Sequence, residues 1–171
     1  MIHLKDYDNG VAKFHQEFHL NATPLFSWNF YGTVLQQLRN ANLDTQKIDQ
    51  IAATFKWESA NWELKKALYE DVIVVTDPAL KIVFSSQNMV KMNGYKAEEV
   101  VGKTPRMFQG KDTCIETSKE IKIAIQKQLP FEKKVLNYKK NGDPYYCIIK
   151  GFPIFNKKGF LSHFIAFEKT A

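Results

Sequence analysis

The stretch NGYKAEEVVGK, residues 93–103, decides the fold of this 171-residue chain. Gly94 and Gly102 interrupt a helical pattern that extends over residues 87–101. Because glycine permits sharp turns, the pattern predicts short helical pieces rather than one long helix. We expect these pieces to lie over a sheet that the flanking sequence supplies.

Runs of β-branched and aromatic residues on both sides of this stretch predict five strands. Residues 72–75 and 81–84 flank the turn signal Thr76-Asp77-Pro78 and read as a hairpin. Asn141-Gly142 and Lys158-Gly159 mark the turns of a later three-stranded meander, over residues 131–138, 145–153 and 160–168.

A longer helix is predicted between the hairpin and the meander, over residues 113–128. Thr113 and Glu116 have capping-box spacing at its start, and Pro130 ends it. The predicted fold class is therefore α+β, a five-stranded antiparallel sheet with its helices on one face.

The first seventy residues read as helical. The predicted helices cover residues 11–20, residues 25–38, a stretch that Asp44 caps and that continues through Phe55, and a stretch from Ser59 to Tyr69. We expect residues 1–70 to form an N-terminal helical extension, for dimerisation or for capping the sheet, and residues 71–171 to form the main domain.

The order of elements and four local strings resemble the PAS family over residues 71–169. The strings are NGYKAEEVVGK at 93–103, TPRMFQG at 104–110, NYKKNG at 137–142, and PIF at 153–155 with FIAFE at 164–168. The resemblance implies a PAS fold and a sensory or interaction role in signal transduction.

Within that family the nearest pattern is the flavin-binding LOV branch, whose light-sensing members carry NCRFLQG where this chain has TPRMFQG. The thiol that forms a reversible flavin adduct in that branch aligns with Pro105, which has no nucleophilic atom. The chain thus resembles a LOV-like PAS domain that lacks the photoactive cysteine.

The resemblance also implies candidate pocket residues. Arg106 and Gln109 match the phosphate-contacting Arg and the Gln after it, and Asn137 matches the first ring-binding Asn. Cys147 replaces the second Asn, and Glu168 replaces the signalling Gln of the last strand. Arg106 and Gln109 have an alternative structural role, bracing helix ends.

These replacements disfavour a flavin cofactor. A flavin ring edge alternates donors and acceptors, which amides match, whereas a thiol is a weak donor and an ionised carboxylate only accepts. A haem is also not expected, since His163 alone follows residue 19 and strand alternation places it opposite Glu168. For Cys147, a small buried hydrophobe is favoured over a redox-sensing thiol.

Composition limits the remaining function classes. The net charge of +6 comes from residues 71–171, and the scattered lysines disfavour a nucleic-acid partner over solvated surface charge. Cys114 and Cys147 lack metal-ligand spacing, so no metal is expected. No catalytic motif, signal pattern or membrane-length apolar run is present, which predicts a non-catalytic cytoplasmic protein.

The expected function is a sensory PAS module that binds a small molecule or a partner and acts through its N-terminal helices, as a homodimer or on a signalling protein. The join at Glu70-Asp71 is the expected lever between helix and sheet. Two alternatives stay open: an interaction domain whose pocket its own side chains fill, and a basic nucleic-acid-associated regulator.

Overall fold

The computed structural model describes residues 25–58 and 64–171. Its contacts divide the chain into two units, Met1–Gln36 and Gln37–Ala171. The predicted helix over residues 11–20 and the predicted cap at Ser59 lie outside the described residues. The second unit holds the sheet and everything described below about packing.

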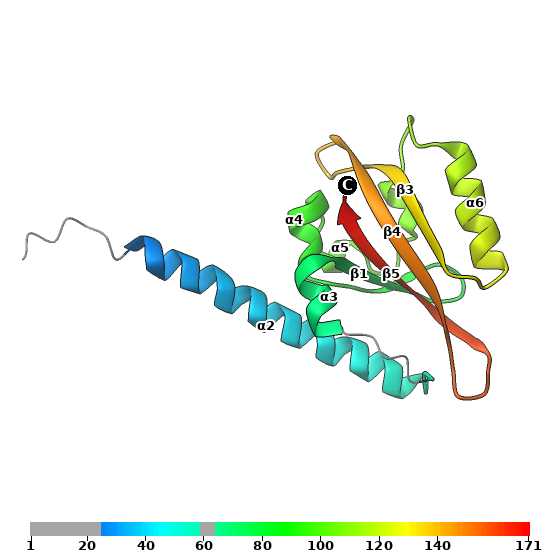
Figure 1. Cartoon of the computed structure of the whole chain (residues 1–171), viewed down its shortest axis with the longest axis horizontal. Coiled ribbons are helices and arrows are strands. Elements are labelled where there is room, and N and C mark those ends of the chain that lie inside the picture. The colour runs from blue at the N-terminus through cyan, green and yellow to red at the C-terminus, as the bar shows by residue number, and fades with distance from the viewer. Residues whose placement is uncertain (1–24, 59–63) are drawn as a thin grey trace, which may run out of the picture. The chain divides into compact units, whose positions relative to one another are not determined.

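A five-stranded antiparallel sheet forms the centre of the second unit, in the order β2-β1-β5-β4-β3 (Figure 1). Its strands are β1 Val72–Thr76, β2 Ile82–Ser85, β3 Phe131–Tyr138, β4 Pro144–Phe155 and β5 Leu161–Thr170. All five strands were predicted to within a few residues. The first hairpin joins the meander through β1 and β5, where Val72 pairs with Glu168.

Four short or medium helices lie over one face of the sheet: α4 Met89–Asn93, α5 Ala97–Val100, η1 Pro105–Phe108 and α6 Ile115–Gln126. Gly94 and Gly102 have φ of 81° and 82°, so the predicted interruptions are confirmed. Val72 and Val74 of β1 pack against Met89, Val100 and Phe108 from these helices.

The capping box predicted at Thr113 and Glu116 is wrong. Helix α6 begins one residue later, at Ile115, and its N-cap residue Cys114 makes no side-chain cap. The Thr113 hydroxyl instead donates to the Leu136 carbonyl at 2.7 Å and accepts from the Gly110 N–H at 3.0 Å. The Thr113 side chain therefore connects the loop before α6 to β3. This long-range hydrogen bond cannot be predicted from local residue spacing.

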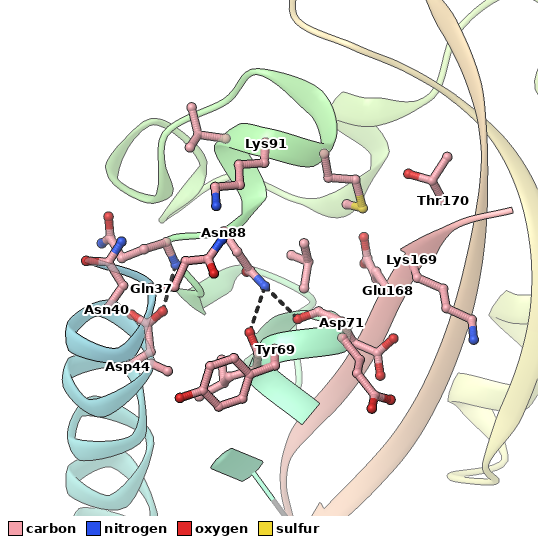
Figure 2. Close-up of a pocket in the computed structure, with 17 residues that line it drawn as sticks. Gln37, Asn40, Asp44, Tyr69, Asp71, Asn88, Lys91, Glu168, Lys169 and Thr170 are labelled. Atoms are coloured by element: carbon pink, nitrogen blue, oxygen red, sulfur yellow. Dashed lines mark hydrogen bonds between the residues drawn. The ribbon is translucent and has the colours of Figure 1, made fainter. Parts of the chain in front are cut away.

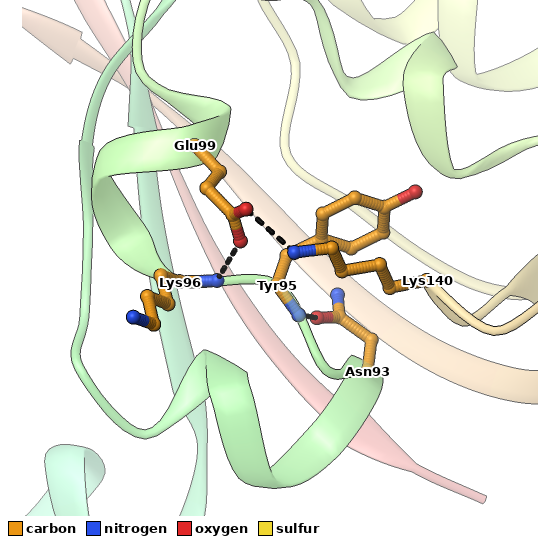
Figure 3. Close-up of polar contacts among 5 residues, drawn as sticks. All are labelled: Asn93, Tyr95, Lys96, Glu99 and Lys140. Carbon is orange, nitrogen blue, oxygen red and sulfur yellow. Dashed lines mark hydrogen bonds and ion pairs between the residues drawn. The ribbon is translucent and has the colours of Figure 1, made fainter.

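A capping contact is present at a different helix, α5, within the stretch 93–103 (Figure 3). Glu99 accepts from the Lys96 N–H at 2.8 Å and pairs with Lys140, which belongs to the turn between β3 and β4. Asn93 accepts from the Tyr95 N–H through its side chain. Lys140 N–H in turn donates to the Asn93 carbonyl, so this stretch is tied to the β3–β4 turn.

The opposite face of the sheet is covered by the N-terminal helices. Ile73 and Val75 alternate with Val72 and Val74, and they pack with residues of helix α2 (Leu25–Thr54) and helix α3 (Leu64–Glu70). The contributing helical residues include Ala41, Ile48 and Leu68. The part of α2 from residue 37 onward therefore caps the sheet.

The predicted break before Asp44 is wrong, because α2 continues through it as one helix. Asp44 is 2% exposed and its Oδ2 accepts from the Gln87 N–H at 2.8 Å. Its polar partner is therefore in another element and not at its own helix start. Helix α3 ends at Glu70 and β1 begins at Val72, so the expected close join is confirmed.

Candidate functional site

A cavity of about 560 Å³ lies between the sheet and the helices η1 and α6. Arg106, Gln109, Asn137 and Glu168 line this cavity, and so does Pro105. Residues from the end of the last strand and from the loop after α5 thus meet around one space. This volume lies in the range of small-molecule sites.

Most of the wall is apolar, with Val74, Val135, Ile149, Phe164 and Ala166 from the sheet. Helix α6 adds Ser118, Ile121, Lys122 and Ile125. Its twelve residues include none that is buried, although Ile121 and Ile125 face the cavity. The protein's own side chains therefore leave this space open.

Cys147 lies beside the cavity and not in its lining. Its side chain is 0% exposed and its Sγ donates to Glu168 Oε2 at 3.8 Å. Burial, with Glu168 nearby, raises the pKa of the Cys147 thiol well above its usual range. The thiol therefore stays protonated and acts as a donor to Glu168.

Glu168 is a buried carboxyl group in the cavity wall, 4% exposed. Burial raises its pKa from the usual 4.5 to about 7, against a smaller lowering by the Cys147 hydrogen bond. Below that pH the group is neutral and carries one O–H donor beside an acceptor oxygen. A neutral Glu168 can match a ligand edge much as an amide does.

Tyr145 and Asn137 lie near Glu168, and Asn93 lies near Tyr145; sequence reasoning singled out only Asn137. Tyr145 is 7% exposed and Asn93 and Asn137 are 0% and 3% exposed. Burial raises the Tyr145 pKa to about 12, and the amides of Asn93 and Asn137 lower it in part. The Tyr145 hydroxyl has no hydrogen-bond partner among the described residues. Strand alternation from Cys147 could have identified Tyr145.

Two cations line the same cavity from different elements, Arg106 of η1 and Lys122 of α6. Both residues are exposed. Sequence reasoning missed Lys122, although the spacing of Ser118, Lys122 and Ile125 on one helical face was a usable signal. The cavity thus has a cationic rim and a polar wall.

His163 lies on the other face of β5, as predicted. It is 2% exposed, and its Nδ1 accepts from Trp57 Nε1–H at 3.1 Å. Burial lowers its pKa, with a smaller opposite effect from Asp77. The imidazole therefore belongs to the contact between the α2 end and the sheet.

Within 25–58 and 64–171, no group of three His, Cys, Asp or Glu side chains is placed to hold a metal ion. In the same ranges, no helix is both long and apolar enough to cross a membrane.

Comparison with known families identifies the domain. The family model described as "PAS domain" matches residues 70–169, which is more than half of the chain. The chain belongs to the PAS domain family. The matched residues of this PAS domain include the cavity lining and all of the sheet except Thr170, the last residue of β5.

Curated relatives of this PAS domain carry light-sensing names. Protein TWIN LOV 1 of Arabidopsis thaliana is 35% identical over 111 residues, which is 61% of this chain and 28% of that protein. A blue-light-activated histidine kinase of Brucella canis is 34% identical over 97 residues, 55% of this chain and 20% of that protein. The chain therefore spans only a fifth to just over a quarter of these relatives.

Solved structures agree on the fold. A light-oxygen-voltage domain from a study of a flavin analogue has a TM-score of 0.60 at 22% identity, over 65% of this chain and 86% of that one. The LOV domain of the photoreceptor Aureochrome1 in its light state has a TM-score of 0.58 at 22% identity, over 62% and 85%. The PAS domain here is LOV-like in architecture.

Proposed function

We propose that this PAS domain is a non-catalytic sensory module whose cavity binds a small molecule. The observation that carries the proposal is the open space of about 560 Å³, against which α6 buries none of its residues. A ligand there would cover Ile121 and Ile125 and gain the free energy of burying apolar surface. A pocket filled by the domain's own side chains would leave no such space.

The lining defines the chemistry of the ligand. An apolar body suits the walls, one polar edge would face Asn137 and Glu168, and an anionic end would meet Arg106 and Lys122. Neutral Glu168 would both donate and accept at that edge.

A flavin is the first ligand to test, because relatives of this chain are named as blue-light and LOV proteins. The sequence argument against it assumed an ionised Glu168, whereas burial raises the pKa of that group to about 7. When bound, a flavin would supply absorption of blue light. Pro105 offers no thiol to it, so Asn137, Glu168 and Arg106 would hold it without an adduct at that position.

The test is the absorption spectrum and native mass of the purified full chain, compared with an Ala166→Leu variant that fills the cavity. We expect a bound small molecule in the wild type and its loss in the variant, with the circular dichroism spectrum unchanged. An Ala53→Leu variant, on an exposed position of α2, is the matched control and should keep the ligand. Colourless wild-type protein with no bound mass, and an unchanged melting temperature on adding flavin mononucleotide, would favour the interaction domain instead.

We further propose that residues 1–70 act as the output extension of the domain at 71–171, in a cytoplasmic homodimer or toward a signalling partner. Support comes from the short α3–β1 join, where Asn88 donates to the carbonyls of Leu68 at 3.1 Å and Asp71 at 2.8 Å. A shift of β1 would therefore move the end of α3 with it.

A further inference from the structure

A second cavity, of about 320 Å³, lies where α2, α3, α4 and the end of β5 meet (Figure 2). All of its lining residues lie within 37–171. Glu168 is shared with the first cavity, but the rest of the lining is different and more polar. The family resemblance and the proposed cavity ligand leave this site unassigned.

The chief feature of this second cavity is a buried carboxylate with an unused acceptor. Asp44 lines the cavity and is 2% exposed. Its Oδ2 accepts from the Gln87 N–H, while its Oδ1 has no hydrogen-bond partner among the described residues. A buried acceptor without a partner is costly, so a ligand that donates to Oδ1 would be favoured.

The neighbouring polar groups restrict where a ligand can bind. Asn88 is fully engaged, since its Nδ2 donates to two carbonyls and its Oδ1 accepts from Ser86. Figure 2 shows Asp44 reaching from α2 toward the start of α4, on the same side as Gln37 and Asn40. Asp44 is therefore a group in the lining whose Oδ1 lacks a hydrogen-bond donor.

The charge of the lining favours a cation. Glu70 and Asp71 join Asp44 as acids, against the exposed Lys91 and Lys169, and Glu168 adds negative charge only above about pH 7. An anionic ligand would have to approach a buried carboxylate, which electrostatic repulsion opposes. Ala41, Leu68, Val72 and Met92 provide apolar surface for a short carbon chain.

We propose that this second cavity binds a small organic cation, whose primary ammonium or guanidinium group donates to Asp44 Oδ1. The volume is at the low end of small-molecule sites, so the ligand has few heavy atoms. Bound there, it contacts α2, the α3–β1 join and Glu168 together, and it holds the sheet-capping part of α2 on the domain.

The probe for this site is putrescine, a short diamine, with butanediol as its neutral match and succinate as its anionic match. Binding to the full chain is measured by calorimetry and by the shift in melting temperature. We expect putrescine alone to bind and to raise the melting temperature, because it binds the folded state. Asp44→Asn should weaken putrescine binding by about tenfold or more, since the charged acceptor is lost.

Lys91→Met is the second variant, because it keeps Asp44 and removes a positive charge from the lining. Its affinity for putrescine should equal or exceed that of the wild type, and this holds even if Asp44→Asn fails to fold. The proposal is overturned if butanediol stabilises the chain as much as putrescine does, or if the chain prefers succinate. It is also overturned if Asp44→Asn binds putrescine as tightly as the wild type, or if neither the wild type nor Lys91→Met binds putrescine.

Discussion

At the scale of single residues, burial changes the chemistry of Glu168. The sequence places an acid near the end of the last strand, where an ionised group would be expected. In the folded sheet, Glu168 accepts a hydrogen bond from Cys147 and lines the cavity. Burial raises the pKa of Glu168 to about 7. A residue that reads as a permanent anion is therefore neutral over part of the physiological range.

Glu168→Gln should remove a pH dependence of stability. The pKa of Glu168 is raised on folding, from 4.5 to about 7, so its stabilising effect is complete below about pH 4.5 and is lost as pH rises through 7. The shift corresponds to about 3 kcal/mol. Urea unfolding between about pH 5 and pH 8 should show the wild type losing stability while Glu168→Gln loses much less.

The matched control for this experiment is Glu132→Gln, an exposed acid of β3 that pairs with Lys150. It should follow the wild-type pH profile. If Glu168→Gln and Glu132→Gln have the same profile as the wild type, Glu168 does not titrate as inferred.

At the scale of elements, the loop after β2 holds two helices on the sheet. The Ser86 N–H donates to the Ile73 carbonyl of β1, and the Ser86 hydroxyl accepts from the Ile73 N–H. The Gln87 N–H donates to Asp44 of α2, and the Asn88 side chain donates to the Leu68 carbonyl near the end of α3. Three consecutive residues therefore fix β1, α2 and α3 relative to one another within residues 37–171.

Asn88→Ala should loosen the α3–β1 join. It removes both donors to the carbonyls of Leu68 and Asp71, and we expect a loss of about 2 kcal/mol in the free energy of unfolding. Hydrogen exchange should become faster at residues 68–73 than elsewhere in the sheet. Lys91→Ala, on the exposed side of α4, serves as the control, and equal losses in both variants would contradict this role.

The end of α2 is held by a second contact, between Trp57 and His163. Phe55 adds a ring contact to His163 at 4.5 Å between centroids, and Trp57 pairs with Asn156 in a β-bridge. Trp57→Phe should cost about 1–2 kcal/mol, because the ring becomes smaller and the buried His163 Nδ1 keeps only the Ser162 hydroxyl, at 2.8 Å, as a polar neighbour. Chemical denaturation measures this loss; Tyr69→Phe, at a side chain 52% exposed, should cost little. Similar stability of Trp57→Phe and the wild type would mean that the contact contributes nothing.

At the scale of the whole molecule, the two faces of one sheet have different roles. One face and its short helices enclose the cavity, while the other packs against α2 and α3 through Ile73, Val75 and Ile165. Ala41 and Ile48 of α2 belong to that second core. The helices before β1 are thus part of the folded domain from at least residue 41.

Two shortened chains test this arrangement. A chain that begins at Gln37 keeps Ala41, Asp44 and Ile48, so its melting temperature should stay within a few degrees of that of the full chain. A chain that begins at Asp71 uncovers the apolar outer face and should aggregate or unfold. Thermal melts and light scattering measure both. A stable, monodisperse chain beginning at Asp71 would contradict the capping role. If the chain beginning at Gln37 has the same oligomeric state as the full chain, any dimer contact lies after residue 36.

The sequence by itself determined the elements of this protein and their class. Strand alternation, the glycines at 94 and 102, and the turn pairs at 141–142 and 158–159 are local signals, and they located all five strands and the helices α4 and α5, though not the helix η1. They also placed Glu168 and His163 on opposite faces of β5, because side chains alternate along a strand.

Only the tertiary structure decided the partners of Asp44, Thr113 and Cys147. Asp44 and Thr113 both read as helix caps, yet each bonds an element far away in sequence, Gln87 and Leu136 respectively. The neutral state of Glu168 likewise depends on desolvation by the packed sheet and helices. Local patterns specify backbone conformation, whereas burial and long-range hydrogen bonds exist only once distant segments have packed together.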